Sequence, residues 1–135
     1  MKYFCPFCWR ETSAHDEACP HCGKDIATGC EARSYSEKLL AALRHPEPQT
    51  VRRVVWILGE QQIGEAVAPL LDLLRSAPDI YLAAAICEAL GRIGGSGALP
   101  DLQFRAGHGS VIVRRAARRA LERMKNQGPP GAYDR

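Results

Sequence analysis

The chain has 135 residues, of which 46% are hydrophobic and 24% charged, and its formal net charge is +3. This composition is ordinary for a soluble globular protein, and the length suits one compact domain or a small module attached to a moderate one. The longest apolar runs are far shorter than the roughly 20 residues that span a bilayer, and no signal pattern precedes the first cysteine, Cys5. We therefore expect a cytoplasmic protein with no membrane partner.

Four of the six cysteines form two Cys-x-x-Cys pairs, Cys5 with Cys8 and Cys19 with Cys22. Such pairs in a cytosolic chain are more typical of metal binding than of disulfides. Zinc prefers four ligands in a tetrahedron, and thiolate sulfur serves it well. Iron also accepts four thiolates and is the alternative metal. Four sulfur ligands leave no open position for a catalytic water, so we expect a structural site.

The residues beside the two pairs predict tight turns. Pro6 and Pro20 fix φ near −65° at the start of each turn. Gly23, directly after the second pair, allows a positive φ without steric cost. Trp9 stands at the equivalent place after the first pair, so one turn departs from the usual pattern.

These residues resemble a known module. The segments YFCPFC (3–8) and CPHCGKDI (19–26) are similar to the small zinc ribbons at the N-termini of many bacterial proteins. The resemblance covers residues 1–26 and implies that the four cysteines hold structural Zn²⁺. So short a segment cannot bury enough apolar surface to fold alone, so metal binding must supply its folding free energy. His15 and His21 are expected to be solvent-facing loop residues.

After a linker predicted at residues 27–35, apolar residues recur at the i, i+3, i+4, i+7 spacing of short amphipathic helices. Glycine and proline signals separate these helices. The apolar stripes are, in chain order: Leu39, Leu40 and Leu43; Val51, Val54, Val55 and Leu58; Val67, Leu70, Leu71 and Leu74; Leu82, Ile86, Ala89 and Leu90; Leu99 and Leu102; and Val113, Ala116, Ala117, Ala120, Leu121 and Met124. The final segment, 126–135, is predicted to be a flexible tail because it combines turn-forming residues with no periodicity.

The helical segments repeat with a period near 31 residues, which indicates stacked helix pairs. The dipeptide Leu58-Gly59 recurs as Leu90-Gly91, and each is followed by a turn that contains Ile-Gly: Ile63-Gly64 and Ile93-Gly94. The segments 51–59, 66–74 and 84–91 resemble the HEAT-like repeats of phycobilisome lyases and of many bacterial scaffold proteins. The predicted fold is therefore all-α: a short α-solenoid of HEAT-like helix pairs over residues 36–125, with a zinc ribbon that adds minor β structure.

The last predicted helix carries a broad basic stripe opposite its apolar one. Its members are Arg114, Arg115, Arg118, Arg119, Arg123 and Lys125. Like charges one turn apart destabilise a helix, which suggests an anionic neighbour. Three interpretations stay open: a polar cap at the end of the solenoid, a surface for an acidic protein partner, and a nucleic-acid surface.

Trp56 lies one position away from an apolar stripe, so it either packs against the preceding helix or the ribbon, or serves as an exposed binding anchor. No general-base pair, phosphate loop or activated nucleophile can be placed in a cleft. The sequence therefore favours a zinc-binding, non-enzymatic scaffold or adaptor for a protein partner. The alternatives are nucleic-acid association through the basic helix and, by resemblance to phycobilisome lyases, an auxiliary lyase-like role.

Overall fold

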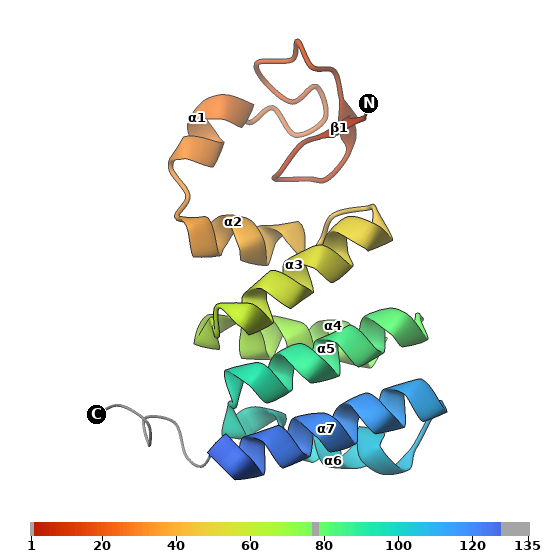
Figure 1. Ribbon diagram of the computed structural model, residues 1–135. Coiled ribbons are helices and arrows are strands. Elements are labelled where there is room, and N and C mark those ends of the chain that lie inside the picture. Colours follow the sequence, from red (N-terminus) through yellow and green to blue (C-terminus); the bar gives the residue numbers. More distant parts are fainter. Residues whose placement is uncertain (1, 77–78, 128–135) are drawn as a thin grey trace, which may run out of the picture. The chain divides into compact units, whose positions relative to one another are not determined.

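The computed structural model describes residues 2–76 and 79–127, which form an all-α architecture with one small two-stranded sheet (Figure 1). This confirms the predicted fold class. Contacts divide the chain into two compact units, Met1–Val54 and Val55–Arg135. None of the helices in the described ranges combines the length and the apolar character needed to cross a membrane.

The first unit begins with a ribbon of two short strands. Strand β1 (Tyr3–Phe4) pairs antiparallel with β2 (Glu11–Thr12), so that Tyr3 faces Thr12. An isolated bridge between Ala18 and Asp25 closes the second half of the ribbon. The strands are too short to form a sheet with a core of its own, which leaves the cysteine cluster as the centre of this module.

Two helices follow the ribbon within the first unit. Helix α1 (Ile26–Glu31) starts where the Asp25 carboxylate accepts a hydrogen bond from the Thr28 amide at 2.9 Å, and it occupies most of the segment predicted as a linker. Helix α2 (Tyr35–Ala42) starts at a capping box in which the Ser34 hydroxyl accepts from the Glu37 amide at 3.1 Å. The helix predicted from the apolar stripe of Leu39, Leu40 and Leu43 is therefore confirmed as α2. Helix α1 was not predicted, and it has no buried residue.

The second unit contains the end of α3 and four further helices. Their bounds are: α3 (Pro48–Glu60), α4 (Val67–Ser76), α5 (Ile80–Ile93), α6 (Leu99–Gly107) and α7 (Val111–Gln127). Short 3₁₀ turns, Gly64–Ala66 and Ser96–Ala98, precede α4 and α6. Helix α5 packs against α7, α4 against α5, and α6 against α7 (Figure 1). The buried side chains lie at the positions predicted from periodicity: Leu58, Leu70, Leu74, Ile86, Leu90 and Leu102 are at most 1% exposed.

The turns after α3 and α5 correspond at a spacing of 32 residues. Gln62 and Gly94 occupy the same place and both have left-handed backbone, with φ of 51° and 78°. The two Ile-Gly dipeptides occupy different places in these turns, because Gly94 ends α5 whereas Gly64 begins a 3₁₀ turn. The structural equivalent of Ile63, which precedes the first 3₁₀ turn, is Gly95, which precedes the second.

Helix α7 continues two residues beyond the predicted end of the repeat module at residue 125. The predicted flexible tail, 126–135, therefore begins inside a helix. Its remaining residues, 128–135, lie outside the described part of the chain.

Two helical glycines let successive helices approach closely. A Cβ on Gly59 would lie 2.8 Å from the Cα of Ala89, and one on Gly91 would lie 2.6 Å from the Cα of Ala120. Real Cβ atoms do not approach backbone this closely, so any side chain at either glycine would push two helices apart. The two contacts fix how α5 sits on α3 and how α7 sits on α5.

Replacing Gly91 with Ala should lower the free energy of unfolding by about 1–3 kcal/mol, the range for overpacking a core. This loss should appear although Ala is the better helix former by about 1 kcal/mol. The control is Gly107→Ala in α6, where an added Cβ meets no atom within 4 Å. Urea unfolding followed by circular dichroism measures both, and equal stability of the two variants would contradict the close-packing account.

Candidate metal centre and basic surface

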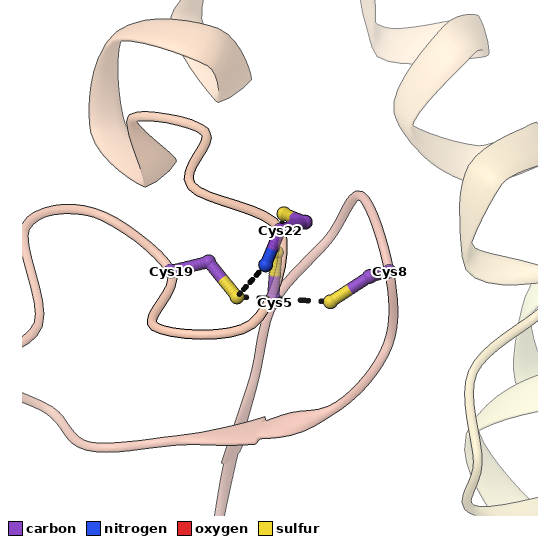
Figure 2. Close-up of side chains that lie close together, drawn as sticks. All are labelled: Cys5, Cys8, Cys19 and Cys22. Atoms are coloured by element: carbon purple, nitrogen blue, oxygen red, sulfur yellow. Dashed lines mark hydrogen bonds between the residues drawn. The ribbon is translucent and has the colours of Figure 1, made fainter.

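The four paired cysteines converge on one point (Figure 2). Their sulfur atoms all lie within 4.8 Å of one another, and the Cys5–Cys22 and Cys8–Cys19 sulfurs are each 3.7 Å apart. A regular tetrahedron with metal–sulfur bonds of about 2.3 Å has edges of about 3.8 Å. The donor set and its spacing therefore fit one tetrahedral metal ion, and all six cysteines of the chain are free thiols.

Two equivalent turns present these sulfurs. The Trp9 amide donates to the Cys5 carbonyl at 2.8 Å, and the Gly23 amide donates to the Cys19 carbonyl at 2.9 Å. Trp9 and Gly23 both adopt left-handed backbone, with φ of 62° and 78°. The turn that departs from the usual sequence thus keeps the usual conformation, and Trp9 tolerates a φ for which glycine is better suited.

Backbone amides point at the cluster and favour the thiolate form. The Cys19 sulfur accepts from the amides of His21 at 3.3 Å and Cys22 at 3.4 Å. Burial acts to raise the pKa of Cys19, but these amides and the thiols of Cys8 and Cys5 outweigh it and lower the pKa to about 6.

Cys8 shows the opposite shift. Its hydrogen bond with the Arg10 backbone acts to lower its pKa, but burial and the neighbouring sulfurs, Cys19 first among them, raise the pKa to about 11. One sulfur of the group thus ionises easily, and its charge opposes ionisation of the next. A bound cation would stabilise all four thiolates.

Three aromatic residues of the ribbon pack within their own unit. The Phe7 ring lies beneath the Arg33 guanidinium at 4.3 Å and the Lys24 ammonium at 5.0 Å. The rings of Phe4 and Trp9 each lie 5.0 Å from the His45 ring. These contacts give three of the aromatic side chains a structural role, and the contribution of Arg33 could not be predicted from a residue so distant in sequence.

The histidines near the pairs stay outside the metal cluster. His15 and His21 are exposed, as predicted, and neither belongs to the four-thiol group found in the described residues. The two other cysteines are also separate from it. Cys30 is half-buried in α1, and Cys87 is fully buried in α5. Burial raises the pKa of Cys87 to about 11, so this thiol is an inert part of the core.

The predicted partner-binding residues lie on two helices of the second unit. Trp56 in α3 is 54% exposed. On α7, Arg114 is half-buried and the others, Arg115, Arg118, Arg119, Arg123 and Lys125, are exposed.

The basic residues of α7 form two rows within the predicted broad stripe. Successive residues of an α-helix are rotated by about 100°. One row therefore contains Arg115, Arg119 and Arg123, and the other contains Arg114, Arg118 and Lys125. The buried face of α7 contains Val113, Ala116, Ala117 and Ala120. The two basic rows lie on either side of the opposite, solvent-facing side of the helix. Arg119 and Arg123 of the first row line a cleft together with residues of α5.

Paired helices, joined by equivalent turns and packed through their apolar faces, define a helical-repeat protein. The model of the HEAT repeats family matches residues 36–127, and the chain belongs to this family. The match runs from the start of α2 to the end of α7. Neither the comparison with curated proteins nor that with solved structures finds a match.

Thiol alkylation should separate the cysteines into three classes. In the metal-loaded protein we expect iodoacetamide to modify Cys30 alone, because the metal protects the four ligands and the core protects Cys87. A chelator should add Cys5, Cys8, Cys19 and Cys22, and only denaturant should add Cys87. Mass spectrometry of the intact and digested protein counts the modifications.

Two outcomes would contradict this assignment. Equal labelling of the four paired cysteines with and without chelator would remove the metal centre. Fast labelling of native Cys87 would show that this thiol reaches solvent.

Proposed function

We propose that the chain is a zinc-stabilised HEAT-repeat adaptor that binds a protein partner without catalysing a reaction. The observation that carries this proposal is the exposure of Trp56 on a packed helix of the repeat module. A large aromatic side chain that is left in solvent on a rigid surface is typical of a binding anchor. Membership of the HEAT family supports it further, because stacked helix pairs offer extended surfaces to partners.

Zinc is the metal we propose for the four cysteines. A closed set of four sulfurs is typical of structural zinc sites, and the metal would organise a ribbon whose strands are only two residues long. Iron fits the same sulfurs and is the alternative.

The purified protein should contain one zinc ion per chain and lack the colour of a ferric tetrathiolate. Cys19→Ser should reduce the metal content, and a chelator should broaden or shift the NMR signals of residues 2–26 while the helical signals of α4 to α7 persist. Metal analysis, absorption spectra and two-dimensional NMR measure these effects. A ribbon whose NMR signals are unaltered by metal removal would rule out the proposed structural role.

Nucleic-acid binding is the second candidate function, and the exposed arginines of α7 favour it. Binding through these residues would weaken steeply as salt increases, because phosphate contacts release counterions. The aromatic rings of the ribbon could stack on bases only if they were free. Three of them, Phe4, Phe7 and Trp9, already pack against neighbouring residues. An auxiliary lyase-like role remains a hypothesis that rests on resemblance alone.

Affinity capture from native extract tests the adaptor function. We expect the wild-type protein to recover a protein partner that Trp56→Ala loses, because removing an anchor side chain typically costs about 2 kcal/mol or more of binding free energy. Phe104→Ala is the matched control, since Phe104 is 58% exposed but belongs to α6. Nuclease treatment of the extract distinguishes a direct protein partner from one bridged by nucleic acid.

The capture experiment can fail in two informative ways. Recovery of the same proteins by wild type and by Trp56→Ala would show that this side chain is no anchor. Loss of every captured protein after nuclease treatment would favour the second candidate function.

A further inference from the structure

A small cleft lies between α5 and α7. Its walls are Glu88 and Arg92 from α5 and Arg119 and Arg123 from α7, with Ala120 also lining it, and its volume is about 220 Å³. Small-molecule sites are usually larger, roughly 300–1,000 Å³. The cleft is therefore of a size for one side chain or a similarly small group.

The repeat places these residues in register with the exposed tryptophan. Gly59 contacts Ala89 and Gly91 contacts Ala120, so each helix is offset from the previous one by about one repeat. Trp56, Glu88 and Arg119 thus occupy equivalent positions on α3, α5 and α7. One turn further along, Glu60, Arg92 and Arg123 are equivalent in the same way. All six side chains belong to one face of the stacked helices.

The charge on this face is uneven. The Arg92 guanidinium lies 3.5 Å from the Glu60 carboxylate, so that arginine is partly neutralised by α3. Arg119 and Arg123 form no ion pair with any side chain in the described part of the chain. Three guanidinium groups and the single carboxylate of Glu88 therefore surround the cleft, and its unpaired positive charge lies on α7.

We propose that this cleft binds the carboxylate of an acidic side chain from a partner protein, with Trp56 holding an apolar side chain of the same segment. The inference rests on the proposed adaptor function and names the chemistry of its partner. Guanidinium groups match a carboxylate because their planar N–H donors can form two parallel hydrogen bonds. Arg119 and Arg123, one turn apart on α7, supply these donors.

A continuous polyanion fits the face less well. A nucleic-acid strand that crossed from α7 toward α3 would meet the carboxylates of Glu88 and Glu60 after leaving the arginines. Like charges in close contact reduce affinity and select against such a partner. A segment with one acidic group at α7 and an apolar group at α3 meets complementary surfaces at both places.

The helix spacing limits the partner sequence. Packed helices lie about 8–10 Å apart, so the cleft between α5 and α7 is about 12–15 Å from the axis of α3. An extended chain covers this distance in about four residues. The segment should therefore carry an aspartate or glutamate about four residues from a large apolar side chain.

The test uses the full-length, metal-loaded protein and a short fluorescein-labelled peptide with this glutamate–leucine spacing. Fluorescence polarisation should give saturable binding at roughly 50 mM salt, where charge contacts are little screened. The same peptide with glutamine in place of glutamate should bind at least tenfold more weakly. Inorganic phosphate and a single-stranded oligonucleotide are added as competitors, to measure whether the cleft binds these anions more tightly than the peptide.

Single substitutions on α7 separate a defined cleft from diffuse charge. Arg119→Ala and Arg123→Ala should each weaken peptide binding about tenfold, whereas Arg118→Ala should change it less than about twofold. The control removes the same charge from the same helix but from the row that does not line the cleft. Glu88→Gln should strengthen binding, because it removes the carboxylate that faces the incoming anion.

Several results would overturn the inference: no binding to the wild-type protein, equal losses for Arg118→Ala and Arg119→Ala, or tighter binding of the oligonucleotide than of the peptide. The adaptor function is judged separately by affinity capture. If Trp56→Ala loses the captured partner and Arg119→Ala retains it, the adaptor function is supported and the carboxylate site is ruled out.

Discussion

The second unit depends on the close approach of backbone to backbone at two glycines. Because Gly59 and Gly91 have no side chain, Ala89 and Ala120 reach helix surfaces that would otherwise be covered. The contact fixes both the distance and the register between successive helices. The register then decides which side chains come together, so the alignment of Trp56, Glu88 and Arg119 on one face follows from a packing constraint in the core. Buried glycine and alanine residues thus determine where the side chains of this exposed face lie.

The ribbon is organised by a different kind of constraint. Its strands contain two residues each, and its apolar contacts are confined to a few aromatic rings, such as Phe7 against Arg33. Four sulfurs at tetrahedral spacing provide the centre that the apolar residues do not. A bound metal ion would therefore order the ribbon through metal–ligand bonds, whereas the repeats gain their order from buried leucine, valine and isoleucine side chains. Loss of the metal would consequently act directly on the first unit, which contains the ribbon.

The sequence predicted what local patterns determine. Cysteine spacing identified the four thiols that cluster, and apolar periodicity identified six of the seven helices in the described residues. Helix α1 was missed because six residues with no buried side chain give no periodic signal. The recurring Ile-Gly dipeptides did not reveal their different places, because a dipeptide cannot distinguish the end of a helix from the start of a 3₁₀ turn. The cleft was missed because its walls combine Arg92 with Arg119, and their proximity depends on the register between two helices.

The same register explains how one backbone arrangement can serve a specific partner. At equivalent positions the repeat carries an aromatic ring on α3, a carboxylate on α5 and a guanidinium on α7, although the helices pack in similar ways. The ion pair between Glu60 and Arg92 connects α3 to α5, whereas Arg119 and Arg123, the cations of this face on α7, form no ion pair with the described residues. The face therefore has direction, apolar at one side and cationic at the other. A partner that binds in the reverse orientation would place its acidic group against Trp56 and its apolar group among arginines, so both contacts would lose their attraction at once.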